Sequence, residues 1–295
     1  MDISTCPNLQ EVKLMLSDFD YTFLNSDHNV PEANAAAFGE VVAAGIIAGI
    51  ASGRSREGTL YCLSPPCDEL MKYNGFPGVF LNGSVVYGRD GKLLSSTEIS
   101  PSSQAVLLDK MKEMGIIGNV MGYTADRIFC IERNVYTETN HTVYKEPEAE
   151  LLSYEEFAAK RFVKLVACGT VESTDRARPI LEKAVAGQLR CVRPLDWNLE
   201  FINPSVSKAV GAKVLLNHLN MTPNQLLAMG DGENDVQVLE LAGVSVAVAN
   251  ACPAAKAAAK YTTVSNNESA FRVVADLVLK ARGKVSTTNS LPQAN

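Results

Sequence analysis

The sequence predicts an α/β fold built on a parallel sheet, with a second α+β domain inserted into it. Apolar runs of strand length alternate with amphipathic runs of helix length near both ends of the chain. This alternation predicts a parallel sheet with helices on both faces. Between residues 84 and 200 the order becomes mixed and includes a hairpin signal. We therefore expect a discontinuous core domain at 1–83 and 201–295, and an inserted domain at 84–200.

The first part of the core is expected to supply three strands, each a short apolar run that follows or precedes a helical pattern. The elements expected here are strand 12–17, helix 31–44, strand 45–51, helix 55–63 and strand 76–81.

The inserted segment opens with two short apolar runs around Arg89-Asp90-Gly91, which is typical of a β-hairpin. The further elements expected in it are helix 101–114, strands 116–123, 127–132 and 162–168, helix 174–186, and strands 189–193 and 199–202.

The alternation resumes after Pro204. The elements expected there are helix 205–219, strand 225–229, helix 236–242, strand 244–248, helix 253–259, strand 261–264 and helix 268–282. The polar, non-periodic tail 284–295 is expected to be disordered.

Composition argues against nucleic acid or a membrane as a partner. The net charge is −6, with 46% hydrophobic and 20% charged residues, which is typical of a soluble globular protein. No apolar run approaches the roughly 18 residues that span a bilayer, and no secretory leader is recognisable. The seven cysteines include no Cys-x-x-Cys, which favours free thiols. We expect a cytoplasmic protein.

The hexapeptide Gly-Asp-Gly-Glu-Asn-Asp at residues 230–235 is the most informative local feature. It lies between the apolar run 225–229 and the amphipathic run 236–242, so it crowds acids onto a turn at the carboxyl end of a strand. Ligands bind at this edge of open α/β sheets. Because crowded carboxylates repel one another, a hard divalent cation with oxygen ligands is the simplest partner.

Three further groups follow predicted strands or open predicted helices. Asp18 and Asp20 are spaced so that one could attack an electrophile while the other transfers protons. Ser52 and Gly53 precede a helix, where a hydroxyl and backbone N–H groups can bind an anion. Lys208 lies in the first turn of a predicted helix, where a cation is unfavourable unless an anion is near. Taken singly, such residues are more commonly a solvated turn, a helix cap and a surface lysine.

Together these groups resemble the four signature motifs of the haloacid dehalogenase (HAD) superfamily of phosphatases. Residues 18–22 (Asp-Phe-Asp-Tyr-Thr) are similar to Asp-x-Asp-x-Thr, and 52–54 (Ser-Gly-Arg) to the Ser/Thr-Gly-Arg of one branch. Lys208 and residues 230–235 stand as the third and fourth motifs. The long segment between the second and third motifs looks like the C2-type cap of the Cof-like branch, subfamily IIB. The resemblance covers about residues 12–282 and implies a Rossmann-like core.

The resemblance implies a role for each motif residue. Asp18 would be the nucleophile that forms an aspartyl-phosphate. Asp20 would protonate the leaving oxygen and then deprotonate the hydrolytic water. Ser52, Gly53 and Lys208 would bind the oxygens of the transferred phosphoryl group.

The resemblance also implies Mg²⁺, held by the carboxylates of Asp18 and Asp231 and by the backbone carbonyl of Asp20. Asn234 and Asp235 would support the metal, its waters or the site lysine. A dication is needed because a carboxylate must approach a phosphate dianion.

Three residues outside the main motifs are possible substrate contacts. Tyr21 stands where the family usually has glycine, and Asn82 and Gly83 resemble the residues at the start of the inserted segment. In the cap, polar side chains at predicted loop ends are further candidates: Tyr123, Arg127, Arg133, His141, Arg193 and Asn198.

The function expected is a Mg²⁺-dependent phosphomonoesterase for small phosphorylated metabolites, sugar phosphates first, working as a monomer or homodimer. One alternative is a phosphohexomutase-type phosphotransferase, which would need a second phosphate subsite; Arg190 and Arg193 are the only evident cap pair for it. Another is a catalytically silent phosphometabolite-binding protein, although binding alone would not need both Asp18 and Asp20. A Rossmann nucleotide-binding enzyme is disfavoured because no Gly-x-Gly-x-x-Gly follows the first strand.

Overall fold

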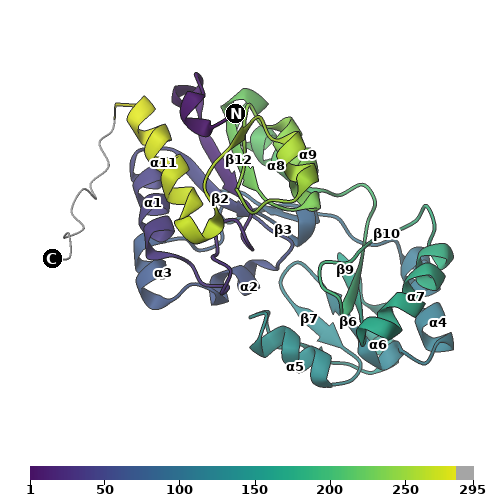
Figure 1. The fold of residues 1–295 in the computed structure, drawn as a ribbon. Helices are drawn as coiled ribbons and strands as arrows, with labels where there is room; N and C mark the ends of the chain where they lie inside the picture. Colours follow the sequence, from purple (N-terminus) through teal and green to yellow (C-terminus); the bar gives the residue numbers. More distant parts are fainter. Residues whose placement is uncertain (284–295) are drawn as a thin grey trace.

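The core of the protein is an eight-stranded sheet with the strand order β14-β13-β12-β1-β2-β3-β4-β5 (Figure 1). The structure is a computed structural model that describes residues 1–283, so the tail expected to be disordered lies outside it. The strands from β14 to β3 are parallel, β4 pairs antiparallel with β3, and β5 pairs antiparallel with β4. The strands are β1 (Leu14–Ser17), β2 (Ile47–Ala51), β3 (Gly78–Phe80), β4 (Val85–Tyr87), β5 (Leu93–Ser96), β12 (Leu226–Gly230), β13 (Val244–Ala247) and β14 (Tyr261–Thr262).

Helices cover both faces of this sheet, which confirms the predicted fold class (Figure 1). One layer contains α1 (Glu32–Ala43), α3 (Pro65–Met71) and α11 (Ala270–Ala281), and the other contains α8 (Lys208–His218), α9 (Val236–Leu241) and α10 (Pro253–Ala258). The short helix α2 (Arg56–Tyr61) follows β2. Within residues 1–283, no helix is long and apolar enough to cross a membrane.

A second sheet, with its own helices, forms the cap, by which we mean β6–β11 and α4–α7 (Figure 1). Its strand order is β10-β11-β9-β6-β7-β8, and α4, α6 and α7 pack with it around a separate apolar cluster that includes Leu107, Phe162 and Phe201. The cap elements are α4 (Pro101–Glu113), β6 (Val120–Tyr123), β7 (Ile128–Cys130), α5 (Val135–Thr142), β8 (Glu150–Leu151), α6 (Tyr154–Ala159), β9 (Lys164–Cys168), α7 (Val171–Ala184), β10 (Arg190–Val192) and β11 (Asn198–Ile202).

The predicted hairpin lies in the core sheet, and its assignment to the inserted segment was wrong. β4 pairs antiparallel with β3, with Gly78 opposite Tyr87, and β5 extends the same sheet. The reason is the short connection: the chain reverses directly after β3 through Gly83, which has a φ of +93°. A reversal this tight returns the chain to the strand it has just left. The second sheet therefore begins only with β6.

Three short helices, α3, α5 and α6, were missed because their sequences carry little apolar periodicity. Capping hydrogen bonds and packing stabilise these helices instead. Asn134 and Ser153 each form a capping box at the start of α5 and α6. The last predicted core strand is also shorter than expected, since β14 is confined to Tyr261–Thr262.

The sheet register brings the motif-bearing segments together. β1 lies between β12 and β2, with Leu14 opposite both Leu226 and Ile47, and every residue of β1 is buried. Because these strands are parallel, their carboxyl ends meet at one edge. The first, second and fourth motifs follow β1, β2 and β12, and so they lie side by side.

Candidate active site

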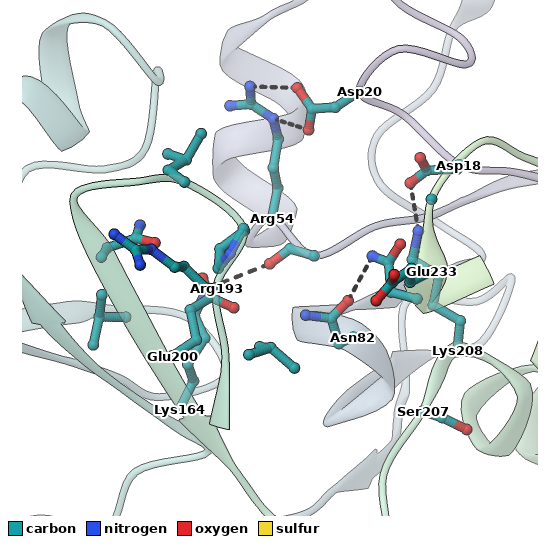
Figure 2. A pocket seen from close by; sticks show the side chains of 18 of the residues that line it. Asp18, Asp20, Arg54, Asn82, Lys164, Arg193, Glu200, Ser207, Lys208 and Glu233 are labelled. Atoms are coloured by element: carbon teal, nitrogen blue, oxygen red, sulfur yellow. Dashed lines mark hydrogen bonds and ion pairs between the residues drawn. The ribbon is translucent and has the colours of Figure 1, made fainter. Parts of the chain in front are cut away.

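A cavity of about 910 Å³ lies between this edge of the core sheet and the cap (Figure 2). Asp18, Asp20, Gly53, Lys208 and Asp231 line it from the core side. The residues that line it from the cap include Tyr123, Tyr144, Lys164, Arg190, Arg193, Asn198 and Glu200. The cavity therefore contains motif residues on its floor and charged cap residues on its roof.

Lys208 joins two motif carboxylates at the floor. Its Nζ lies 2.5 Å from Asp18 Oδ1 and 2.7 Å from Asp235 Oδ1 (Figure 2 shows the contact with Asp18). Burial disfavours the charge on Lys208, but the two carboxylates outweigh it and raise the lysine pKa. For Asp18, burial followed by repulsion from Asp235 raises the pKa well above its ordinary value. The lysine is thus fixed by the same carboxylate that the resemblance identifies as the nucleophile.

The loop after β12 is ordered around Asp235. Its Oδ2 accepts hydrogen bonds from the backbone N–H groups of Asp231 (3.1 Å) and Gly232 (3.0 Å). A Cβ on Gly230 would lie 2.4 Å from Cγ of Asp235, so this close approach requires glycine. Thr22 Oγ1 donates to Asp231 Oδ1 at 2.8 Å. The side chain of Asp231 is therefore directed to the end of β1.

The acidic cluster can hold a cation. One carboxylate oxygen from each of Asp18, Asp231 and Asp235 lies within 4.8 Å of the others. Both oxygens of Asp235 already have protein partners, in Lys208 and the two N–H groups. The donor set that fits a hard divalent ion is therefore Asp18 with Asp231, and Asp235 positions the groups around them.

Arg54 binds Asp20 with a pair of hydrogen bonds that the sequence did not predict. Its Nε lies 2.7 Å from Oδ2, and its Nη2 lies 2.7 Å from Oδ1 (Figure 2). His28 Nδ1 lies 3.5 Å from the same carboxylate. Burial would raise the pKa of Asp20, but the hydrogen bonds from His28 and Arg54 together lower it to about 2. Asp20 is held as a carboxylate in this conformation.

The cap reaches this pair through the segment after α5. The guanidinium of Arg54 also donates to the backbone carbonyl of Tyr144. The neighbouring Ser55 donates to Glu146 through its N–H (3.1 Å) and its hydroxyl (2.5 Å). Glu146 is buried, and burial raises its pKa. Residues of the cap therefore dock at the start of α2, next to the proposed acid–base residue.

The second motif is divided between the cavity and the interior. Gly53 lines the cavity, whereas Ser52 is buried and its Oγ accepts a hydrogen bond from the Arg54 N–H at 3.1 Å. Ser52 is not among the residues that line the cavity. The serine shapes the loop in this conformation, and the groups facing the cavity are Gly53 and Arg54.

The remaining predicted contacts lie close to the floor. Tyr21 lines the cavity with a φ of +54°, a left-handed conformation that favours glycine over residues with a side chain. Asn82 lines it too, and its Oδ1 accepts from Asn234 Nδ2 at 3.0 Å. Gly83 does not line it; a Cβ there would lie 2.1 Å from the carbonyl oxygen of Ser207. That glycine lets the chain pass close to the start of α8.

Tyr123, Arg193 and Asn198, three of the cap candidates, line the cavity. The others do not: Arg127 and Arg133 pair with glutamates on the surface, and His141 contacts the backbone carbonyl of Glu146.

Lys164 and Glu200, which sequence reasoning missed, form a buried ion pair of 2.7 Å on the cavity roof. Lys164 Nζ also lies 3.4 Å from the carbonyl oxygen of Gly53 (Figure 2). In the sequence, each of these charged residues interrupts an otherwise apolar strand, and this pattern could have indicated them.

The chain belongs to the haloacid dehalogenase-like hydrolase family, whose model matches residues 15–274. It is 28% identical to the 5-amino-6-(5-phospho-D-ribitylamino)uracil phosphatase YbjI of Escherichia coli, over 91% of this chain and 97% of that protein. A Plasmodium vivax protein classed as a HAD/COF-like hydrolase superposes with a TM-score of 0.85 at 28% identity, covering 92% of this chain and 96% of that one. These matches confirm the predicted family and its Cof-like character.

One relative is much longer than this chain. The chloroplastic endoribonuclease YBEY of Arabidopsis thaliana is 33% identical over 261 residues, which are 85% of this chain and 44% of that protein. The chain therefore spans less than half of that relative.

Proposed function

We propose that the protein hydrolyses phosphomonoesters of small metabolites with Mg²⁺, sugar phosphates first, through an aspartyl-phosphate on Asp18. The observation that carries the proposal is the contact of Lys208 with both Asp18 and Asp235, beside Asp231, at the open edge of the core sheet. This arrangement supplies a carboxylate nucleophile, a fixed cation and a metal-binding pair in one place. Membership of a hydrolase family supports the reaction class.

In the first step Asp18 attacks phosphorus, and the bond to the leaving oxygen breaks as that oxygen takes a proton from Asp20. In the second step Asp20 takes a proton from water, which attacks phosphorus and releases phosphate from Asp18. Arg54 holds Asp20 ionised. Its hydrogen bonds must therefore loosen before Asp20 can deliver a proton in the first step.

Mg²⁺ would be held by the carboxylates of Asp18 and Asp231 and by the backbone carbonyl of Asp20. When bound, it supplies positive charge that lowers the repulsion between a carboxylate and a phosphate dianion. Lys208 adds a fixed positive charge from the protein, and Gly53 offers backbone at the cavity wall for the phosphoryl oxygens. Ser52 supports this loop, and Asp235 and Asn234 hold Lys208 and the loop after β12.

The leaving group would lie under the polar roof, between the ion pair of Lys164 with Glu200 and the segment that ends at Asn198. The name of the E. coli relative describes a phosphorylated sugar alcohol attached to uracil, which supports including such compounds among the substrates tested. The cytoplasmic location and the monomeric or dimeric state remain predictions from the sequence.

The proposal is tested by phosphate release from sugar phosphates, nucleotides, pyridoxal phosphate and p-nitrophenyl phosphate. Each is measured with Mg²⁺, with EDTA, and with the Asp18→Asn variant. We expect release that requires Mg²⁺ and disappears in the variant. Release that persists with EDTA or in Asp18→Asn would exclude this mechanism. Interconversion of hexose phosphates with a bisphosphate activator, without net release, would favour the mutase instead.

A further inference from the structure

One wall of the cavity carries a group of buried polar atoms that have no protein partner. Within residues 1–283, Nε of Arg190, Nε of Arg193 and Oδ1 of Asn198 are buried and make no hydrogen bond. All three residues line the cavity and lie on β10, on β11 or in the loop between them. The other buried polar atoms of this kind belong to residues away from the cavity: Glu57, Ser84, Gln104, Thr263 and Asp276.

The strand register places this wall next to the catalytic floor. Val192 lies opposite Glu200 in the sheet. Arg190 is two residues from Val192, and Asn198 is two residues from Glu200. Both side chains therefore share the sheet face that lines the cavity. Arg190 Nη2 donates to the backbone carbonyl of Val206 at 2.9 Å. Since Val206 and Lys208 are two positions apart, their Cα atoms are separated by at most about 7.6 Å. Arg190 therefore lies beside the segment that delivers the site lysine.

Arg190 is also the cation of the cavity whose charge is not balanced. No carboxylate in the described part of the chain pairs with it, and burial lowers its pKa without any opposing acid. A guanidinium remains charged in such a setting. The other lining cations all have acidic partners: Arg54 with Asp20, Lys164 with Glu200, Arg178 with Glu182, Arg193 with Asp175, and Lys208 with Asp18 and Asp235.

We propose that Arg190 forms a subsite for a second anionic group on the leaving group, either a carboxylate or a second phosphate. A guanidinium matches the planar or tetrahedral oxygens of such groups. A site with unpaired buried groups discriminates strongly against analogues that leave them unpaired. This inference rests on the proposed function, because it concerns the leaving group of that reaction.

The test compares kcat/KM within matched pairs of phosphomonoesters. Glycerol 1-phosphate against 3-phosphoglycerate reports a carboxylate, and fructose 6-phosphate against fructose 1,6-bisphosphate reports a second phosphate. In one of the two pairs, we expect the wild-type kcat/KM for the substrate with the second anion to exceed that for its partner by about tenfold or more. Arg190→Gln should bring that ratio close to one, and Arg190→Lys should restore part of it. Arg176→Gln, a 73% exposed arginine of α7 paired with Glu172, should keep the wild-type ratio.

Binding separates failure of the subsite from failure of the reaction. The same pairs are titrated calorimetrically into Asp18→Asn, with and without Arg190→Gln. One outcome is that turnover is absent while Asp18→Asn binds the compound with the second anion more tightly than its matched partner, and Arg190→Gln removes this difference. That result would support the subsite and contradict the proposed reaction. Mg²⁺-dependent turnover with ratios near one in both arms, or a ratio that Arg190→Gln leaves unchanged, overturns the subsite. Absence of both turnover and binding overturns both proposals. If Arg190→Gln does not fold, Arg190→Lys is measured in its place and should lower the same ratio.

Discussion

Arg54 and Asp20 form a two-point ion pair, with both contacts at 2.7 Å, at the place where the cap meets the core. The guanidinium is almost fully buried, and it also donates to a backbone carbonyl of the cap. The protonation state of the proposed acid–base residue and the docking of the cap therefore depend on the same side chain.

The first prediction concerns the pKa of Asp20. The folded-state pKa is about 2 against an ordinary 3.8, so the pair stabilises the fold above about pH 4, and this stability is lost as the pH falls through 2. Arg54→Gln should raise the pKa toward its ordinary value and remove up to about 2 kcal/mol of stability at neutral pH. Carboxyl NMR titration, assigned with Asp20→Asn, measures the pKa. An unchanged value in Arg54→Gln would contradict the role given to Arg54.

The second prediction concerns cap docking. Glu146→Ala leaves the N–H and hydroxyl of Ser55 without their buried acceptor, which costs about 1–3 kcal/mol. We expect kcat/KM to fall by roughly fivefold to a hundredfold, since the cap docks less often. Glu148→Ala, which removes an exposed partner of Arg133, is the matched control. Equal kinetics in the two variants would show that the contact of Glu146 does not hold the cap.

The third prediction concerns the buried lysine. Lys208→Met leaves Asp18 and Asp235 facing each other without their shared cation, so we expect a loss of roughly 3–5 kcal/mol in the free energy of unfolding. Urea denaturation measures it, with Lys213→Met on the exposed face of the same helix as control. Adding Asp18→Asn should recover part of the loss, because it removes one of the two charges. Lack of recovery in the double variant would show that the destabilisation has another origin.

The core and the motif residues could be predicted from sequence because both depend on local signals. Apolar runs fix the parallel strands, and residues that end such strands must meet at one edge. That reasoning brought Asp18, Asp231 and Lys208 together before any geometry was known. The hairpin was misplaced because strand patterns do not say which sheet a strand joins.

The contacts between cap and core could not be predicted in this way. Glu146 meets Ser55, and Lys164 meets Gly53, across long stretches of sequence. Their partners depend on how two separately folded sheets face each other, which no periodicity encodes. The sequence placed Arg54 in a motif, but its ion pair with Asp20 depends on the bend of the loop after β2.

The fourth prediction concerns the metal. Mg²⁺ should raise the thermal midpoint of the wild type, because an ion that binds only the folded state stabilises it by mass action. Asp231→Asn should weaken this response by removing one carboxylate of the donor pair. Glu240→Gln, an exposed acid of α9, should respond to Mg²⁺ as the wild type does. A full Mg²⁺ response in Asp231→Asn would place the ion elsewhere.

In the proposed reaction Asp18 carries the phosphoryl group, and rapid acid quenching during turnover of a phosphate-labelled substrate would trap that intermediate. We expect label bound covalently to the wild type in the presence of Mg²⁺, located on the peptide that contains Asp18, and no label on Asp18→Asn. Label on another residue, or Mg²⁺-dependent turnover of Asp18→Asn with no labelled protein, would contradict it.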